Sequence, residues 1–406
     1  MIGFLNTNEK SECFGCEACS QICGKNAIKM MEDVEGFRYP IIDNQLCIKC
    51  GKCHQVCPYE NFPENFKYPY LVYGGYHIDR MIRENSTSGG AFSAIVNSWC
   101  ENENYVIFGA SSEGLEVFHT YIEDKNKINI FRKSKYMQST IGNSFQRAKE
   151  MLANGKKVIF SGTPCQIAGL KNFLNTVKYD NLLTIEVVCE GVPSPLFMKR
   201  YNEWIYSQYN STIKSIDYRF KDGNKWDFEV MSVLLNNGKT IKKDRWFNPF
   251  WSIWLKHLMT RPSCYKCPFA TSNRTADITL GDLWGVHLYC PELYGNNFGA
   301  SLVVCNSQKG EQVFLKSKKQ FYGHELNFET ALKYQSPMRK TIDENENRQE
   351  FMYDLGRMNY KEICKKWSDK PTFKLLFSKY IWGNRQKILF WKLKQKLLKR
   401  PIERGE

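Results

Sequence analysis

Two stretches of the chain decide its amino-terminal fold: Cys13-Phe14-Gly15-Cys16-Glu17-Ala18-Cys19-Ser20-Gln21-Ile22-Cys23 and Cys47-Ile48-Lys49-Cys50-Gly51-Lys52-Cys53-His54-Gln55-Val56-Cys57. Both have the spacing C-x2-C-x2-C-x3-C. Such a run lets three thiolates of one tight loop cap three irons of a [4Fe-4S] cluster, while the fourth thiolate comes from elsewhere. The two runs therefore predict two such clusters.

The last cysteine of each run is expected to serve the other cluster, as in two-cluster ferredoxins. One cluster would then be held by Cys13, Cys16, Cys19 and Cys57, and the other by Cys47, Cys50, Cys53 and Cys23. A pair of zinc sites is the alternative, but zinc usually takes two separated cysteine pairs rather than two identical runs of four. Gly24 follows the first run where Pro58 follows the second. Glycine also allows the turn, so both clusters are expected.

The composition is that of a folded protein. The chain has 406 residues, of which 42% are hydrophobic and 24% charged, which excludes disordered and collagen-like classes and predicts two or three domains. No apolar stretch approaches the ~18 residues of a membrane span, and residues 1–10 lack the pattern of a secretory signal, so we expect a cytoplasmic protein. In a reducing cytosol the 16 cysteines favour metal or redox chemistry over disulfides.

Beyond the cysteine runs, a proline-rich stretch from Pro58 through Pro63 to Pro69 predicts a domain boundary near residue 65. The pattern then becomes mixed α/β. Strands are expected over 71–76, 105–110, 157–160 and 182–188, and helices over 91–100 and 141–154.

A turn at the start of the first of these helices is rich in hydroxyls and glycine: Asn85-Ser86-Thr87-Ser88-Gly89-Gly90-Ala91. Backbone N–H groups and the helix dipole make such a turn suitable for a phosphate. The simpler interpretation is that Ser88 only caps the helix.

Four further cysteines lie at the ends of predicted elements. Thr163 caps a helix and Cys165 falls in its first turn, where the helix dipole favours thiolate over thiol. This activated cysteine is a nucleophile, a redox thiol or an iron ligand, and a hydrolase is disfavoured because none of the six histidines lies in a recognisable motif. Together with Cys189 and the pair Cys264 and Cys267 it supplies four thiolates, enough for a third cluster. The alternative is that Cys165 and Cys189 are buried apolar cysteines.

Several motifs now stand in one order along the chain: the two cysteine runs, Ser-Gly-Gly at 88–90, Lys-Tyr-Met-Gln-Ser at 135–139, Gly-Thr-Pro-Cys-Gln at 162–166, Cys-Glu-Gly-Val-Pro-Ser at 189–194, Cys-Tyr-Lys-Cys at 264–267 and Asp-Ile-Thr-Leu-Gly-Asp-Leu-Trp-Gly at 277–285. Together they resemble the beta subunit family of coenzyme F420-dependent hydrogenases and dehydrogenases, over roughly residues 10–310. The resemblance implies an enzyme in which FAD lies beside a [4Fe-4S] cluster and exchanges hydride with a deazaflavin or a similar carrier.

The resemblance also implies roles for individual residues. The FAD contacts would be Ser88, Gly89, Gly90, Lys135, Gln138 and Ser139, and the ligands of the flavin-proximal cluster would be Cys165, Cys189, Cys264 and Cys267. Asp277 and Asp282 match the acidic motif near that cluster, and their simpler role is turn capping. Hydride transfer itself needs no side-chain acid or base, so no catalytic side chain is assigned.

The predicted fold class is therefore α+β. A ferredoxin-like domain with two [4Fe-4S] clusters would occupy residues 1–62, and a mixed α/β flavin and iron-sulfur domain residues 68–310. A helical extension would follow over 311–369, and a basic amphipathic tail over 370–406.

The tail carries much of the formal net charge of +15. Residues 370–404 contain eleven Lys and Arg against one Glu, and Leu389, Leu393 and Leu397 recur every fourth residue. A basic amphipathic helix of this kind can lie on an anionic membrane, which would place the protein at the inner face of the membrane. An equally weighted alternative is a helix docked on the protein's own body. Nucleic-acid binding is not expected, because no nucleic-acid fold motif accompanies the charge.

Two functions of different classes follow. The first is an iron-sulfur flavoprotein oxidoreductase that moves electrons between a hydride carrier, FAD, the clusters and a partner protein; the family resemblance extends this to a role in cell-surface polysaccharide synthesis. The second is a non-enzymatic ferredoxin-like electron-transfer or accessory protein that has lost the flavin site.

Overall fold

The computed structural model describes residues 3–63, 65–101, 104–175, 179–221, 230–294, 298–382 and 384–398. An eight-stranded sheet in the order β13-β3-β12-β11-β7-β6-β4-β5 forms its centre. The strands are β3 (Leu71–His77), β4 (Tyr105–Glu113), β5 (Glu116–Ile122), β6 (Lys157–Gly162), β7 (Leu182–Val187), β11 (Ile278–Asp282), β12 (Ser301–Cys305) and β13 (Phe321–Glu325). The middle strands β11, β7, β6 and β4 run parallel to one another, and the outer pairs are antiparallel.

Helices cover both faces of this sheet. On one face α5 (Ala91–Trp99) and α12 (Gln308–Ser317) pack through Ile95 and Phe314 against a core that includes Ile107. On the other face α6 (Ser144–Ala153) and α7 (Pro164–Leu174) pack against Phe108 and its neighbours. Adjacent residues of a strand point to opposite faces, so an uninterrupted apolar strand such as β4 can serve both cores. The strands and helices expected in this region are confirmed, with boundaries shifted by at most about three residues.

A smaller antiparallel sheet, β10-β9-β8, stands beside the first. Its strands are β8 (Ile213–Phe220), β9 (Val230–Leu235) and β10 (Thr240–Lys243), and the helices around it are α8 (Pro195–Tyr209), α9 (Pro249–Trp254), α14 (Arg348–Arg357) and α15 (Tyr360–Trp367). Buried aromatic side chains of α9, among them Trp251 and Trp254, fill the space between them.

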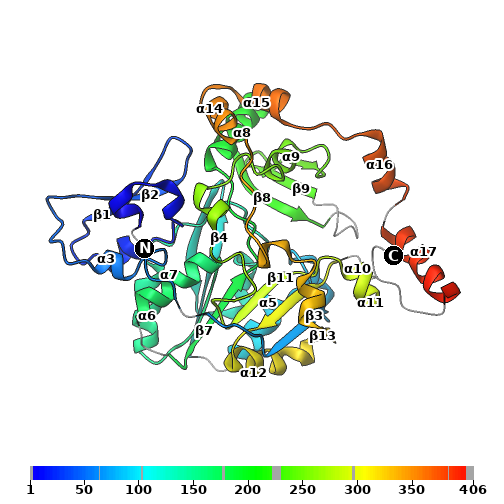
Figure 1. The fold of residues 1–406 in the computed structure, drawn as a ribbon, viewed down its shortest axis with the longest axis horizontal. Helices are drawn as coiled ribbons and strands as arrows, with labels where there is room; N and C mark the ends of the chain where they lie inside the picture. The colour runs from blue at the N-terminus through cyan, green and yellow to red at the C-terminus, as the bar shows by residue number, and fades with distance from the viewer. Residues whose placement is uncertain are drawn as a thin grey trace.

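The cysteine runs lie in a separate amino-terminal unit. It is built from α1 (Phe4–Thr7), η1 (Lys10–Glu12), α2 (Ala18–Ile22), the hairpin β1 (Ile28–Glu32) and β2 (Arg38–Ile42), and α3 (Lys52–Gln55). This unit is the blue flank beside α6 and α7 in Figure 1. The buried carboxylate of Glu17 accepts hydrogen bonds from the backbone N–H groups of Ile141 and Gly142 at 3.2 and 3.1 Å. Glu35 forms an ion pair of 2.6 Å with Arg348. The unit is therefore docked firmly on the rest of the chain.

Residues 311–369 differ from the helical extension that the sequence predicts. They contain β13, which joins the edge of the main sheet antiparallel to β3. This strand fits only because Gly323 opposes two glycines of β3: a Cβ at Gly323 would lie 2.0 Å from the carbonyl oxygen of Gly74. The need for glycine at position 323 comes from a strand about 250 residues away in the sequence. The residues around Gly323 therefore do not predict this strand pairing.

The carboxy-terminal tail forms α16 (Phe373–Tyr380) and α17 (Asn384–Leu398), drawn in orange and red in Figure 1. Residues 399–406, which hold part of the predicted basic tail, lie outside the described residues. Among the residues that the structure describes, no helix has the length and apolar character needed to cross a membrane.

A buried ion pair ties the parallel strands together and gives the first prediction. Arg274 Nε lies 2.5 Å from Glu186 Oε1, with side-chain exposures of 3% and 0%, and Thr279 donates to the same carboxylate at 2.8 Å. Glu186→Gln should lower the free energy of unfolding by about 3–5 kcal/mol, because it leaves a buried guanidinium without its counter-charge. Urea unfolding of anaerobically purified protein measures this. Glu123→Gln, which breaks a surface ion pair with Lys156, should cost under about 1 kcal/mol, and equal effects would contradict the assignment.

Candidate functional site

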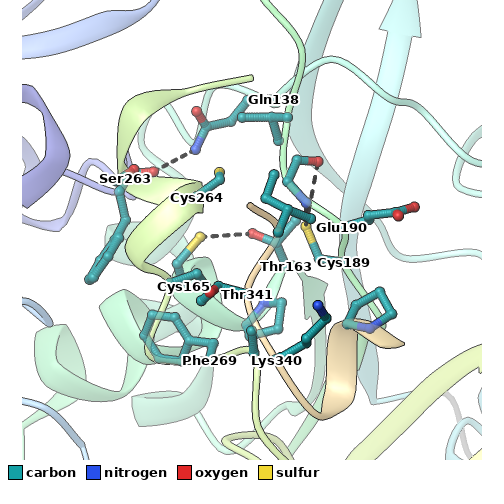
Figure 2. Close-up of a pocket in the computed structure, with 18 of the residues that line it drawn as sticks. Gln138, Thr163, Cys165, Cys189, Glu190, Ser263, Cys264, Phe269, Lys340 and Thr341 are labelled. Atoms are coloured by element: carbon teal, nitrogen blue, oxygen red, sulfur yellow. Dashed lines mark hydrogen bonds between the residues drawn. The ribbon is translucent and has the colours of Figure 1, made fainter. Parts of the chain in front are cut away.

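Four cysteines from distant parts of the chain meet at one pocket. Figure 2 labels three of them, Cys165, Cys189 and Cys264. Cys165 lies in the first turn of α7 and Cys189 follows β7, so both stand just beyond the carboxyl ends of neighbouring parallel strands. This edge is where open α/β sheets usually bind ligands. Cys264 lies in the short helix η4 (Pro262–Lys266), and Cys267 ends it. The structure thus brings together all four cysteines that the family resemblance proposes as ligands of a third cluster.

Local hydrogen bonds hold two of these sulfur atoms. Thr163 and Gln166 form a capping box at the start of α7, and Thr163 Oγ1 lies 3.2 Å from Cys165 Sγ. The backbone N–H of Gly191 donates to Cys189 Sγ at 3.4 Å. Hydrogen bonds to sulfur stabilise the thiolate form that ligates iron and tune a cluster's potential.

Burial dominates the electrostatics of these thiols. It raises the pKa of Cys189 well above its usual value, and the neighbouring thiols of Cys264 and Cys165 raise it further. Burial also raises the pKa of Cys264 to about 11 and that of Cys267 to about 12. The sequence predicts a low-pKa, activated Cys165, and this is wrong for the protein alone: burial raises its pKa and outweighs the hydrogen bond from Thr163. A nucleophilic Cys165 is therefore disfavoured.

The donor set fits a four-iron cluster. Each of the four thiols makes ionisation of its neighbours less favourable. A metal bound between them reverses this effect, because metal ligation deprotonates cysteine. Four thiolates are the ligand set of a [4Fe-4S] cluster. Phe14 and Phe269 complete the pocket with apolar walls, which limit access of water to such a cluster.

The four cysteines expected to hold the first amino-terminal cluster lie near one another. Burial raises the pKa of Cys16 strongly, and the neighbouring thiols of Cys19, Cys57 and Cys13 add to this. Cys57 of the second run therefore lies with three cysteines of the first. Around Cys53, burial again acts first, and Cys47 and Cys50 are the neighbouring thiols. Cys23 Sγ accepts a hydrogen bond from the backbone N–H of Ala27 at 3.3 Å.

Helix α7 brings the two kinds of cysteine site close together. A Cβ at Gly169 of α7 would lie 3.0 Å from Cys16 Sγ, and Gly169 is one turn along the helix from Cys165. A side chain at residue 169 would force the amino-terminal cysteine loop to shift by a few tenths of an ångström, so glycine favours this close approach.

A buried arginine, which the sequence did not single out, lies between the two sites. Arg261 is 1% exposed. Its guanidinium donates to the carbonyls of Cys13 and Arg38 at 2.9 and 3.0 Å and to Gln138 Oε1 at 3.3 Å. Burial alone would lower the pKa of Arg261, but the nearby Cys13, Tyr39 and Cys264 raise it above its usual value. The side chain is thus a fixed cation between the two groups of thiols.

The predicted flavin contacts divide into two groups. In the first group, the polar atoms of Gln138 and Ser139 already have hydrogen-bond partners within the protein. Gln138 Nε2 donates to the Phe14 carbonyl at 2.7 Å, and Ser139 Oγ lies 2.9 Å from His119 Nδ1. Gln138 also lines the cysteine pocket. Gln138 thus connects the amino-terminal unit to the cysteine pocket, whereas Ser139 holds His119 and Gln166.

The Ser88 to Gly90 turn is held against the sheet. Ser88 Oγ donates to the Ala300 carbonyl at 2.5 Å, and the Gly89 N–H donates to Ser301 Oγ at 2.9 Å. A Cβ at Gly89 would lie 2.4 Å from a backbone oxygen of β3, and Gly90 has a φ of +87° at the start of α5. These contacts explain the residue types by packing and by the turn itself, with the hydroxyl of Ser88 used internally.

Two half-buried lysines, Lys135 and Lys221, lie beside this turn. Lys221 Nζ donates to the carbonyls of Arg83 and Ser88, and Lys135 Nζ donates to the carbonyls of Ile130 and Arg132 at 2.9 and 2.8 Å. Burial lowers the pKa of each lysine to about 7. An anion bound here would restore both charges, so the turn and these lysines fit a phosphate group.

The two aspartates of the acidic motif have structural partners. Asp277 accepts hydrogen bonds from the backbone N–H of Thr184 at 2.9 Å and from Ser307 Oγ at 2.6 Å. Asp282 forms an ion pair of 3.0 Å with Arg219 and favours the charged form of Lys221.

Other contributors also escaped sequence analysis. Lys340, Thr341 and Ile342 line the cysteine pocket, although they lie in the segment expected to be a separate extension. The preceding Pro337 lies in the short helix η6 (Ser336–Met338), and nothing in the sequence of residues 340–342 marks them as pocket residues. Nothing in the spacing or the neighbours of Lys221 and Arg261 marks either residue in the sequence.

Comparison with known families decides the assignment. Residues 155–328 match the family that describes the C terminus of the coenzyme F420 hydrogenase/dehydrogenase beta subunit, and residues 12–61 match the 4Fe-4S dicluster domain. The resemblance drawn from the motifs is thereby confirmed over these two stretches: residues 155–328 are similar to the C terminus of the beta subunit of an oxidoreductase family, and residues 12–61 are similar to a domain that holds two iron-sulfur clusters.

No curated protein matched the chain. Among solved structures, a chain of the F420-reducing [NiFe] hydrogenase complex from Methanosarcina barkeri is similar, with 15% sequence identity and a TM-score of 0.43. The similarity covers 73% of this chain and 91% of that chain.

Replacing one pocket cysteine tests the third cluster. Cys165→Ala should lower the iron content of anaerobically purified protein by about four per chain, because a [4Fe-4S] cluster needs its four thiolates. The matched control is Cys364→Ala, which removes a cysteine of α15 outside the pocket and should leave the iron content unchanged. Metal analysis by plasma emission measures both, and equal iron in Cys165→Ala and wild type would rule out the third cluster.

Proposed function

We propose that this chain is an iron-sulfur flavoprotein oxidoreductase, in which FAD exchanges a hydride with a soluble carrier such as a deazaflavin. The proposal rests on one observation: a single segment, residues 133–139, extends from the lysines beside the Ser88 turn to the cysteine pocket. At one end Ser134 N donates to Thr87 Oγ1 at 2.7 Å, and at the other Gln138 lines the pocket. FAD, when bound, would accept an electron pair and pass electrons on singly.

The cofactors would be held by distinct parts of the chain. Lys135 and Lys221, beside the Ser88 turn, would bind the diphosphate of FAD. Cys165, Cys189, Cys264 and Cys267 would hold the proximal [4Fe-4S] cluster, and the eight cysteines of the two amino-terminal runs would hold two more. We assign no side chain a catalytic role, because the residues bind, orient and exclude water.

The arrangement supports a direct route for electrons. The close approach of Cys16 to Gly169 of α7 supports a position next to the pocket for a cluster held by Cys13, Cys16, Cys19 and Cys57. Cys50 is exposed, so the second amino-terminal cluster lies at the surface, where a partner protein can exchange electrons with it. The order would be carrier, FAD, proximal cluster, two amino-terminal clusters and partner, in either direction.

The flavin assignment predicts a binding site that depends on Lys221 and on pH. Lys221→Met should reduce FAD affinity by about 10- to 100-fold, because a charge-assisted hydrogen bond contributes about 1.5–3 kcal/mol. Both lysines have a pKa of about 7 without ligand, and a bound anion raises it. Binding is therefore strongest below pH ~7 and weakens as the pH rises above it.

Flavin released from anaerobically purified protein after dialysis at about pH 6 and about pH 8.5 measures both effects. Lys214→Met, which changes an exposed lysine of the neighbouring strand β8, should retain the wild-type flavin content. Wild-type protein that holds its iron but binds no flavin would overturn the enzyme proposal. The non-enzymatic electron-transfer function would then be the correct one.

We also propose that the tail attaches the protein to the inner face of an anionic membrane, where an enzyme of cell-surface polysaccharide synthesis would meet its substrates. The described part of α17 supports this, because Leu389, Phe390, Leu393 and Leu397 are 62%, 61%, 51% and 81% exposed. Lysines such as Lys392 and Lys396 lie between them and are also exposed. Exposed apolar side chains interleaved with cations are typical of helices that lie in the membrane interface.

Vesicle flotation tests the tail. Wild-type protein should float with vesicles that contain phosphatidylserine and much less with neutral vesicles, and added salt should weaken the interaction. The double variant Leu389→Glu, Leu393→Glu should lose flotation by about tenfold or more, because each charge opposes insertion of the apolar face. Leu315→Glu, at a position of α12 that is 45% exposed, is the matched control. Equal flotation with neutral and anionic vesicles would exclude the charge-dependent attachment.

A further inference from the structure

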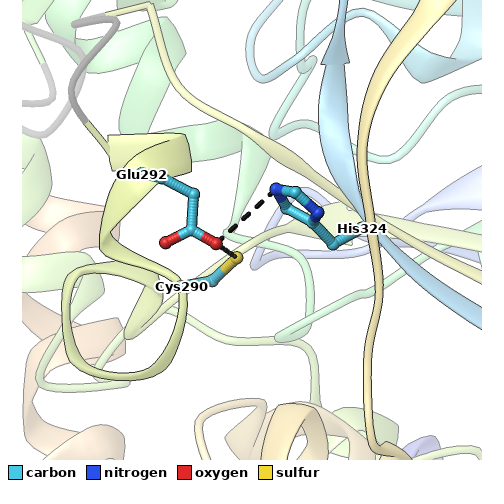
Figure 3. Close-up of side chains that lie close together, drawn as sticks. All are labelled: Cys290, Glu292 and His324. Carbon is cyan, nitrogen blue, oxygen red and sulfur yellow. Dashed lines mark hydrogen bonds and ion pairs between the residues drawn. The ribbon is translucent and has the colours of Figure 1, made fainter.

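A second group of metal-ligating side chains lies away from the cysteine pocket, at the edge of the main sheet (Figure 3). Cys290, Glu292 and His324 each offer one ligand atom, and these atoms all lie within 4.8 Å of one another. Cys290 Sγ lies 3.0 Å from Glu292 Oε1, and His324 Nε2 lies 3.5 Å from the same oxygen. Neither the cluster sites nor the proposed flavin site includes any of the three.

Three backbone elements fix these positions. Cys290 is the residue that ends α10 (Val286–Tyr289), and its N–H donates to the Val286 carbonyl at 2.8 Å. Glu292 lies in the first turn of α11 (Pro291–Tyr294), which follows directly. His324 lies on β13, the edge strand of the eight-stranded sheet. The strand and the helix pair are thus separate elements that meet at these side chains.

The sulfur is anchored, whereas the other two ligands face solvent. Cys290 is 3% exposed and packs in the apolar cluster that includes Leu283 and Leu293. The side chains of Glu292 and His324 are 51% and 44% exposed. A metal ion can therefore reach the site from solvent, and small rotations of the two exposed side chains can bring their ligand atoms around it.

The arrangement does not suit a nucleophilic cysteine. A cysteine nucleophile needs the imidazole next to its sulfur, with the carboxylate behind the imidazole to orient it. Here the order is reversed, because Glu292 stands between Cys290 and His324 (Figure 3). A thiol that donates to a carboxylate is not activated for attack.

The chemistry of the donor atoms selects the metal. Ca²⁺ and Mg²⁺ take six or more oxygen ligands, so a sulfur and an imidazole nitrogen disfavour both. Zn²⁺ binds cysteine sulfur, histidine nitrogen and glutamate oxygen with four ligands in tetrahedral geometry. Three protein ligands leave one position for water. The residues are thus matched to zinc by type and by number.

We propose that Cys290, Glu292 and His324 bind one Zn²⁺ ion, which fastens the turn between α10 and α11 to the edge strand β13. On binding, the Cys290 thiol gives up its proton to solvent, neutral His324 supplies Nε2 and Glu292 supplies a carboxylate oxygen. No electron is transferred. The metal replaces the hydrogen bond and the ion pair that now join the three side chains, and it secures a strand that has a sheet neighbour on one side only.

Metal analysis of full-length protein with its full iron content tests the proposal. After incubation with about one equivalent of ZnCl₂ and gel filtration, wild type should retain about one zinc per chain. Cys290→Ser and His324→Asn should each lower retained zinc by about tenfold or more without changing iron. Glu292→Gln, a change at a half-exposed residue, should lower zinc less and leave folding intact. The controls are Cys364→Ser and Glu325→Gln, which should retain zinc.

Cobalt provides a second readout. Co²⁺ bound to a thiolate gives a sulfur-to-metal charge-transfer band, and the difference spectrum should show this band in wild type and in both controls. The band should be absent from Cys290→Ser. Zinc retention that is equal in wild type and Cys290→Ser, or zinc lost only together with iron, would overturn the proposal, because the zinc would then reside at the cluster cysteines.

Discussion

The buried guanidinium of Arg261 is the contact on which the arrangement of cofactor sites depends. It joins the Cys13 and Arg38 carbonyls of the amino-terminal unit to Gln138 beside the cysteine pocket. Its ring neighbour is Tyr39, whose ring centroid lies 4.4 Å from the guanidinium carbon. A buried cation is tolerated only with counter-charges and filled hydrogen bonds. Cys13, Cys165 and Cys264 lie close enough to Arg261 to raise its pKa, so the proposed cluster thiolates would supply those counter-charges.

This contact also explains why the amino-terminal unit is not free to move. The sequence predicts a boundary near residue 65, and a proline-rich linker would ordinarily permit independent domains. Here Phe66 instead pairs with Arg274 in an isolated antiparallel bridge, and Glu17 accepts two backbone hydrogen bonds from residues 141 and 142. Because electron transfer requires fixed, short separations, docking of this kind suits a relay better than a tethered ferredoxin would.

Local patterns in the sequence were sufficient for the cysteine runs and for most strands and helices of the main sheet, because apolar periodicity and thiolate spacing are short-range signals. They were insufficient wherever a partner lies far along the chain. Strand β13 can pair with β3 only because glycines of β3 leave room for it. The pKa of Cys165 is raised by burial, which outweighs the effect of the α7 dipole. Lys221 is notable only because folding buries it beside the Ser88 turn.

The burial of ionisable side chains also links cofactor binding to the stability of the fold. Without cofactors, burial keeps the thiols around Cys189 protonated and lowers the pKa of Lys135 and Lys221 to about 7. The proposed thiolate-bound cluster and the proposed diphosphate would reverse both effects, because each would pair a buried group with an opposite charge. Ligands that bind only the folded state stabilise it by mass action. If the proposed cofactors bind, they therefore also contribute to the stability of the folded chain.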